Sequence, residues 1–416
     1  MPYKQKLTRK AAFGAGLFCL FLPAAALAGA YLLSAHGSGT IGVERAAMAS
    51  AGYARGNCGH CHEMHASLAG DEPAPAGGAA SGFLLLADGF DAGASSNPYS
   101  QTHSACFQCH ASAGSLQSGV LTNYNYSHTF GGGPVTVSSI MDAFNQASYH
   151  NLYDIQRYIT GISGTKSFNS FPAGSNPCSG CHNVHLAKAN WRTPGNPANT
   201  AMSRPSDHNN LWGDDTSERM TAWGAQAYQP LRYGTSPTLL EPDGSSSDRA
   251  TQAEKTPNYP ALCIDCHNAT NTIYSTRAGR DLKKFDWGLE VHGMAAAENW
   301  TEKTEMRSPY VDTRLGSYVL SCMDCHEPHG SSNRTLIRSM VNAKAVVLPV
   351  GSSDWGNLCS SCHVATEDLR SFHHRVRADA GYACSACHIG GTSSGNMVAC
   401  INCHYHGSST AAFKLF

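Results

Sequence analysis

The five-residue pattern Cys-x-x-Cys-His constrains this chain of 416 residues more than any other feature. Its eight copies, called motifs 1 to 8 below, begin at residues 58, 106, 178, 263, 322, 359, 384 and 400. The copies use sixteen of the 17 cysteines, and the remaining one, Cys19, lies in an apolar N-terminal segment. The motif cysteines are Cys58, Cys61, Cys106, Cys109, Cys178, Cys181, Cys263, Cys266, Cys322, Cys325, Cys359, Cys362, Cys384, Cys387, Cys400 and Cys403.

This spacing is the attachment signal of a c-type haem. Two thiols three residues apart on one helical turn reach the two vinyl groups of a porphyrin, and the histidine that follows binds the iron. The sequence therefore predicts eight haem c groups. The predicted proximal iron ligands are His62, His110, His182, His267, His326, His363, His388 and His404.

Two other uses of the cysteines fit less well. Zinc sites pair two Cys-x-x-Cys knuckles or use separate histidines, so they do not need a histidine directly after every second cysteine. A disulfide framework suits a secreted protein but leaves the recurring histidine unexplained.

Thirteen further histidines are more than enough for the opposite faces of eight irons. Methionines show no recurrent placement, so bis-histidine ligation is the simplest prediction, which gives six-coordinate iron with no open position for a substrate. Motifs 1, 3 and 5 continue to a second histidine three residues on, namely His65, His185 and His329. That imidazole lies on the same side of the haem as the proximal one, so we expect it to bind a neighbouring haem.

Other candidates for distal ligands stand in the gaps between motifs or near the C-terminus. His373 and His374 are adjacent, and His374 is preferred, while His406 follows His404 by two residues. The predicted distal set is His65, His128, His150, His185, His292, His329, His374 and His406. Surface or propionate-bonding roles are expected for the reserve histidines His36, His60, His103 and His208.

Residues 1–28 have the pattern of a cleaved secretory signal peptide: a basic start, an apolar stretch over 11–22 and an Ala-x-Ala site at 26–28. An uncleaved anchor over 11–33 is the alternative. No later segment reads as membrane-spanning. Cleavage leaves 25 basic and 30 acidic residues, a net charge of −5. Sixteen haem propionates would make it more negative, which argues against a nucleic-acid partner.

Residues 29–416 are expected to form one octahaem unit, with a haem-dense C-terminal part over 322–404. Each haem has about 48 residues around it, fewer than an independent domain needs, so the haems are expected to form the core. The predicted fold is mostly irregular coil with short α-helices and very little strand, an extended chain wrapped around a continuous stack of eight haems. Short helices are expected at the motifs and over 138–158, 295–305 and 336–343.

Three segments carry a resemblance to a known family: CGHCHEMH at 58–65, CMDCHEPHGSSN at 322–333 and CINCHYHG at 400–407. They are similar to the multihaem cytochromes with paired Cys-x-x-Cys-His motifs, in particular the filament-forming outer-surface cytochromes of metal-reducing bacteria. The resemblance implies alternating stacked and perpendicular haem pairs and export beyond the outer membrane. It also implies a histidine shared between subunits, and His65 holds the similar position. Eight haems exceed the number in the most similar filament formers, so the subunit register is not carried over.

The predicted function is therefore conduction of electrons along eight bis-histidine haems, with no catalytic residue. The predicted partners are identical subunits joined end to end in an extracellular filament, other c-type cytochromes, and external acceptors such as metal oxides. One alternative is a soluble periplasmic or cell-surface shuttle. Another is an octahaem oxidoreductase of a small nitrogen or sulfur compound, although the Cys-x-x-Cys-Lys motif that often marks such enzymes does not occur in the sequence.

Overall fold

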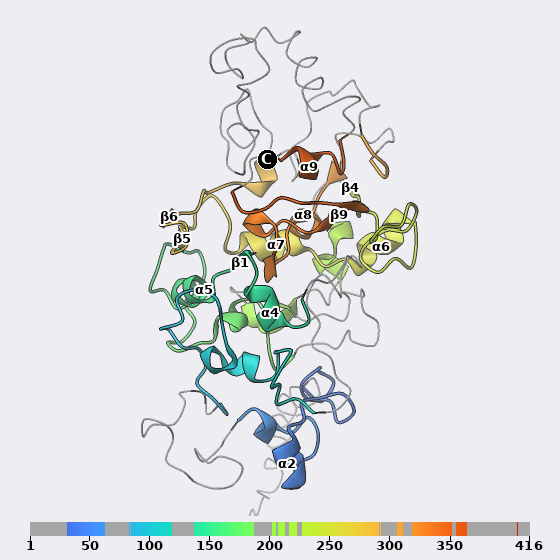
Figure 1. The fold of residues 1–416 in the computed structure, drawn as a ribbon. Helices are drawn as coiled ribbons and strands as arrows, with labels where there is room; N and C mark the ends of the chain where they lie inside the picture. Colours follow the sequence, from blue (N-terminus) through green and yellow to red (C-terminus); the bar gives the residue numbers. More distant parts are fainter. Residues whose placement is uncertain are drawn as a thin grey trace, which may run out of the picture.

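The computed structural model describes residues 31–62, 83, 85–118, 137–186, 202–204, 207–212, 216–222, 227–290, 292, 306–310, 318–351, 355–363 and 406. Its elements follow one another along one long axis in nearly the order of the sequence (Figure 1). Within the described part, helix α2 (Ala46–Ser50) lies near one end and α9 (Gly356–Cys359) near the other. The segments that carry motifs 1 to 6 therefore follow one another along the described part in nearly sequence order.

The helices within the described ranges are short, and the longest has eight residues. Besides α2 and α9, the described α-helices are α4 (Ile140–Phe144), α5 (Leu152–Ile159), α6 (Arg249–Lys255), α7 (Tyr259–Ile264) and α8 (Cys322–Cys325), and α5 is the longest. The 3₁₀ turns are η1 (Cys58–His60), η2 (Gln101–His103), η3 (Ala105–Gln108), η4 (Pro177–Gly180), η6 (Thr216–Glu218), η7 (Met220–Ala222), η8 (Trp287–Leu289) and η10 (Arg334–Leu336).

The strands of the described residues pair two by two. Four pairs are antiparallel: β1 (Ser148–Tyr149) with β8 (Gly330–Ser331), β2 (Met202–Arg204) with β3 (Asp207–Trp212), β5 (Tyr274–Ser275) with β6 (Arg280–Asp281), and β9 (Met340–Val341) with β10 (Lys344–Ala345). The parallel pair is β4 (Ala227–Tyr228) with β7 (Tyr318–Val319). The pairs β1 with β8 and β4 with β7 join segments that are distant in sequence, and the other three pairs are local.

The helix expected over 336–343 is wrong. Leu336, Asn342 and Ala343 have φ angles of 62°, 51° and 63°, which no α-helix contains. Asn342 and Ala343 instead form the turn between β9 and β10. Two successive residues at positive φ make the turn type that matches the twist of a tight hairpin. The segment expected as a helix over 138–158 is divided between α4 and α5, with β1 between them, and 295–305 lies outside the described residues.

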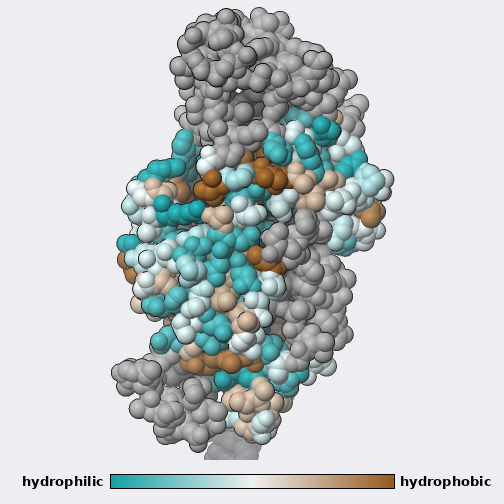
Figure 2. Space-filling view, viewed as in Figure 1, coloured by the Kyte–Doolittle hydropathy of each residue, from teal (hydrophilic) through white to brown (hydrophobic). Residues whose placement is uncertain are grey.

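Buried hydrophobic side chains gather in several small clusters. Phe107 of motif 2 packs with Phe144 of α4, and Leu231 packs with Leu348 near motifs 5 and 6. On the face shown in Figure 2, hydrophobic atoms come in small groups among polar ones. In the described ranges no helix is both long and apolar enough to cross a membrane. Protein packing therefore fixes the motifs locally, a few at a time.

Asn151, directly after His150, caps α5. Its side-chain oxygen accepts from the amide of Asp154 at 3.1 Å, and its amide nitrogen donates to the carbonyl of Ser95 at 2.8 Å. We expect Asn151→Ala to lower the free energy of unfolding by about 1 kcal/mol, measured by urea denaturation. Asp248→Ala, at the exposed N-cap of α6, is the matched control and should cost less, because the cap bond of Asp248 to Thr251 stays within its own helix, whereas Asn151 also bonds Ser95. Equal losses would contradict a role for the Ser95 contact.

Candidate functional site

Motifs 1 to 6 lie within the described residues, and the first cysteine of each lies in a short helix or 3₁₀ turn: η1, η3, η4, α7, α8 and α9. In every one, the amide of the motif histidine donates to the carbonyl of the first motif cysteine, at 2.8 to 2.9 Å. This bond holds both thiols and the imidazole on one turn. The twelve cysteines of these motifs form no disulfide. Their thiols are therefore arranged for attachment to another group.

In motifs 1, 3 and 5, a residue one or two positions before the first cysteine caps the turn. Asn57 accepts from the amide of Gly59 at 2.8 Å, and Asn176 accepts from the amide of Cys178 at 3.0 Å. Ser321 accepts from the amide of Met323 in motif 5. Asn and Ser are good caps because their side-chain oxygens bind amides that a helix start leaves unpaired. The local sequence thus fixes the conformation of each motif before any long-range contact forms.

Every motif histidine of the described part faces one other histidine at a nearly constant distance between ring centres. The pairs are His62 with His185 (6.0 Å), His110 with His36 (6.2 Å), His182 with His329 (6.2 Å), His267 with His150 (6.1 Å), His326 with His406 (6.1 Å) and His363 with His292 (6.3 Å).

This distance fits a metal between the rings. Two imidazoles joined by a direct hydrogen bond would have ring centres about 5 Å apart. Two imidazoles on opposite sides of one metal ion, with bonds of about 2.0 Å, have ring centres about 6 Å apart. A structural zinc ion needs four protein ligands, and no group of three or more ligand side chains occurs among the described residues. Two histidines beside a pair of thiols instead fit haem c, whose porphyrin supplies the other four nitrogen ligands.

Hydrogen bonds orient several of these imidazoles. In four of them Nδ1 lies against a backbone carbonyl: His36 with Val184 at 2.7 Å, His62 with Phe83 at 3.1 Å, His326 with Thr335 at 3.0 Å, and His150 with Pro328. A carbonyl only accepts, so Nδ1 carries the proton and the lone pair is left on Nε2, the atom that can bind a metal.

Burial keeps the imidazoles neutral. Burial, followed by repulsion from neighbouring histidines, lowers the pKa of His110 and His326 to about 4 and that of His267 and His329 to about 3. A neutral ring is the form that binds a metal. At neutral pH these side chains are therefore ready for ligation without losing a proton.

The second histidine of an extended motif faces another motif. His185, three residues after His182 of motif 3, faces His62 of motif 1, and His329 of motif 5 faces His182. His406, near motif 8, faces His326 of motif 5. These contacts link motifs that are far apart in sequence.

The short ladder of β1 and β8 brings the segments of His150 and His329 together. Gly330, after His329, pairs with Tyr149, before His150. A Cβ atom on Gly330 would lie 1.9 Å from the carbonyl oxygen of Ala143, so this close approach requires glycine. The ladder therefore fixes the rings that face motifs 3 and 4.

Cysteines of successive motifs are neighbours. The thiol of Cys106 in motif 2 is hydrogen-bonded to that of Cys178 in motif 3, and Cys263 in motif 4 to Cys322 in motif 5. At the other three junctions, burial first and then the thiolate across the junction raise the pKa of a thiol: Cys109 acts on Cys61, Cys263 on Cys181 and Cys325 on Cys362. Motifs 1 to 6 thus form one row in sequence order.

A buried ion pair supports motif 5. Arg338 donates to both carboxylate oxygens of Glu241, at 2.6 and 3.0 Å, and to the carbonyl of Met323 at 3.0 Å. Asp324 accepts from the hydroxyl of Tyr228 at 3.0 Å, and burial, followed by Glu241, raises the pKa of Asp324 to about 7. The two variable residues of this motif are therefore tied to the surrounding protein.

Of the reserve histidines, one faces a motif histidine, and two bind the backbone nearby. His36 was not among the predicted ligands, yet its ring faces His110. His60 is buried with both nitrogens occupied, since Nδ1 accepts from the amide of Arg45 and Nε2 lies 3.0 Å from the carbonyl of Ala54. His103 accepts from the amide of Ser100 at 3.0 Å. His60 and His103 thus have local structural roles.

Several residues and segments with a predicted role lie outside the described residues, so these roles stay predictions. They are the signal segment 1–28, the motif residues Cys384, Cys387, His388, Cys400, Cys403 and His404, and the distal candidates His65, His128 and His374.

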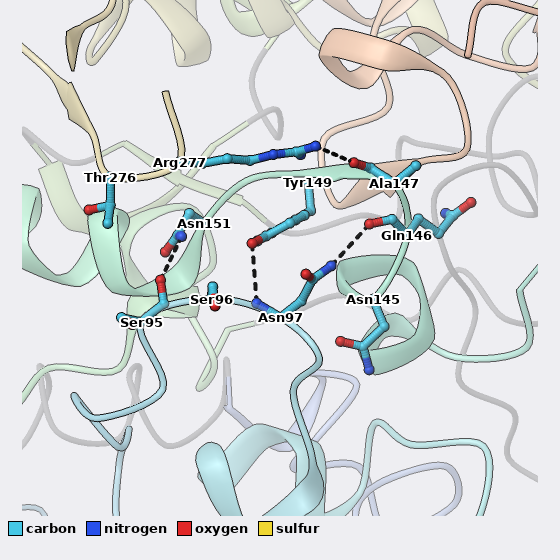
Figure 3. A pocket seen from close by; sticks show the side chains of 10 residues that line it. All are labelled: Ser95, Ser96, Asn97, Asn145, Gln146, Ala147, Tyr149, Asn151, Thr276 and Arg277. Carbon is cyan, nitrogen blue, oxygen red and sulfur yellow. Dashed lines mark hydrogen bonds between the residues drawn. The ribbon is translucent and has the colours of Figure 1, made fainter. Parts of the chain in front are cut away.

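A pocket of about 510 Å³ is lined in part by Tyr149 and Asn151, the two neighbours of His150. Its ten lining residues include no cysteine or histidine (Figure 3). Asn97 donates to the carbonyl of Gln146 at 3.0 Å, and Arg277 donates to the carbonyl of Ala147 at 2.6 Å. The walls of the pocket therefore hold neighbouring loops together and contribute no ligand to the row.

Residues 245–415 match a family model described as outer membrane cytochrome MtrC/MtrF-like, domains II/IV. The matched part contains motifs 4 to 8. No curated protein and no solved structure matches the chain. The match covers less than half of the chain, and over that part the chain is similar to this family of outer membrane cytochromes.

Proposed function

We propose that this chain is an extracellular electron-transfer cytochrome that holds eight c-type haems in one row. The observation that carries the proposal is the set of six histidine pairs at 6.0 to 6.3 Å, each beside a Cys-x-x-Cys turn. The match to outer membrane cytochromes supports the same role. Bound haem iron would supply the chemistry by alternating between its ferric and ferrous states.

The protein's own residues would hold and insulate the row. Each motif would bond a porphyrin through two thiols and present one axial imidazole. The partner histidine would close the opposite face, so substrates would find no open position on the iron. The thiol contacts between successive motifs would keep neighbouring cofactors close together. This arrangement favours conduction over the alternative of a nitrogen- or sulfur-compound oxidoreductase.

Intact-mass analysis and optical spectroscopy of the secreted holoprotein test this function. We expect the mass of eight haems added to the mature chain and a purely low-spin spectrum that carbon monoxide leaves unchanged. Fewer haems would contradict the octahaem row. A stoichiometric high-spin haem that binds nitrite or carbon monoxide would instead favour the enzyme.

The finer proposal is that identical subunits join end to end in a filament that passes electrons to metal oxides or similar external acceptors. Support comes from the resemblance of the segment around motif 1 to filament-forming cytochromes and from the described elements, which follow one another along one axis in nearly sequence order (Figure 1). His65 is proposed as the ligand that reaches a haem of the next subunit. A soluble shuttle is the alternative.

We expect His65→Met to retain all haems but to abolish or strongly shorten filaments, because the joint would lose its shared ligand. Electron microscopy of purified material measures filament length, and intact mass measures haem loading. His103→Gln is the control, since His103 binds its own turn rather than another motif. Filaments of normal length in the His65 variant would remove the proposed role of His65.

A further inference from the structure

We propose that Glu290 is a positioning residue that lowers the reduction potential of the iron held between His326 and His406. This inference rests on the proposed function, because it requires a haem at motif 5. It assigns to this site a potential below the one that the same site would have if the acceptor at His406 were uncharged. The carboxylate would do so through its hydrogen bond to the axial imidazole.

The contact differs in kind from the four carbonyl contacts of the imidazoles described above. Nδ1 of His406 lies 2.7 Å from the carboxylate oxygen Oε2 of Glu290. The corresponding acceptors for His36, His62, His150 and His326 are neutral carbonyls. A hydrogen bond to an ionised acceptor is shorter and roughly twice as strong as one between neutral groups. Motif 5 therefore combines a carbonyl-bonded ring on one side with a carboxylate-bonded ring on the other.

Apolar surroundings strengthen this contact. The side chain of Glu290 is 7% exposed, and Glu290 directly follows η8. The ring centre of Phe285 lies 4.9 Å from that of His406, and Trp287 lies at 5.8 Å. The His406 side chain is 35% exposed, so the shielding acts at the carboxylate end, and a less hydrated acceptor makes a stronger hydrogen bond. The segment from Phe285 to Glu290 thus supplies both the acceptor and its cover.

The chemical consequence follows from the position of the proton. A carboxylate draws the Nδ1 proton toward itself and makes Nε2 a stronger electron donor to a metal. A stronger donor stabilises ferric iron more than ferrous iron, which lowers the reduction potential. The haem of motif 5, between motifs 4 and 6, would then be a site that electrons cross but seldom occupy.

The experiment is a spectroelectrochemical titration of the secreted holoprotein, with Glu290→Gln as the variant. Glutamine keeps the size and an acceptor oxygen but removes the charge. We expect the oxidised-to-reduced ratio of one haem to shift about tenfold toward reduced at a fixed potential, which corresponds to 59 mV for one electron. The low-spin ferric EPR signal of that haem should change as well.

Asp286→Asn is the matched control. Asp286 is exposed at the start of η8 and accepts from the amide of Gly288 at 3.0 Å, a cap that asparagine also forms. The variant removes one negative charge from the same segment without touching an imidazole. We expect all potentials and the EPR spectrum to stay unchanged in it.

A Glu290→Gln protein with the potentials of the control would overturn the inference. If Glu290→Gln does not accumulate, Glu290→Asp keeps the charge but shortens the reach, and a smaller shift of the same sign is expected, whereas no shift would refute the proposal. Intact mass separates this failure from failure of the proposed function. Eight haems with unchanged potentials would reject only the role of Glu290, while missing haems would reject the row itself.

Discussion

Replacing His36 with glycine is expected to turn the haem of motif 2 from low-spin to high-spin. The ring of His36 faces His110 at 6.2 Å, and its Nδ1 is bonded to the carbonyl of Val184. Removal of the side chain would leave the iron with one axial imidazole and a cavity on the other side. An iron with an open position binds carbon monoxide, so about one carbon monoxide molecule should bind per chain.

Added imidazole should restore the low-spin spectrum of this variant, because it can enter the cavity and replace the missing ligand. His60→Gln is the control: His60 also lies in the N-terminal part and is fully buried, but both of its nitrogens bind the backbone. It should lose stability without changing spin state. A fully low-spin His36→Gly protein would show that His36 is not a ligand.

Replacing Arg338 with methionine should lower the free energy of unfolding by about 3–5 kcal/mol. Arg338 and Glu241 form an ion pair in which the side chains are 4% and 1% exposed. Without the guanidinium, the carboxylate of Glu241 would stay buried without its counter-charge beside Asp324. Urea denaturation, followed by the circular dichroism of the backbone, measures the loss.

Two further variants identify the cause of that loss. Arg338→Met with Glu241→Gln removes both charges and should recover part of the stability, since the unpaired charge is the main cost. Lys255→Met breaks the more exposed pair with Asp243 and should cost under about 1 kcal/mol. An Arg338→Met protein no less stable than Lys255→Met would contradict the importance of the buried pair.

The local structure of the motifs could be predicted from sequence because all of its determinants lie within a few residues. Cys58, Cys61 and His62 need one helical turn, and Asn57 before them provides the cap. The spacing of His185 after His182 also predicts a contact with a neighbouring motif, since one turn cannot place both rings on opposite faces of one haem. The ring of His185 does face motif 1.

Long-range positions could not be predicted in this way. His36 has no characteristic spacing from a motif, and its orientation depends on Val184, 148 residues away. His60 lies inside motif 1, yet its bonds to Arg45 and Ala54 give it a structural role. The sequence around 336–343 has helical periodicity, but the turn at Asn342 and Ala343 overrides it. Glu290 belongs to no recognisable sequence motif, and its contact with His406 is visible only in the structure.

The central claim is that paired histidines hold irons in a row that follows the order of the motifs. A cryo-electron microscopy map of the secreted holoprotein, at a resolution that shows axial ligands, tests it most directly. The account predicts one iron between each of the six histidine pairs, and irons 1 to 6 in consecutive order. A map in which His185 and His62 bind different irons, or in which the row is interrupted between motifs 1 and 6, would contradict it.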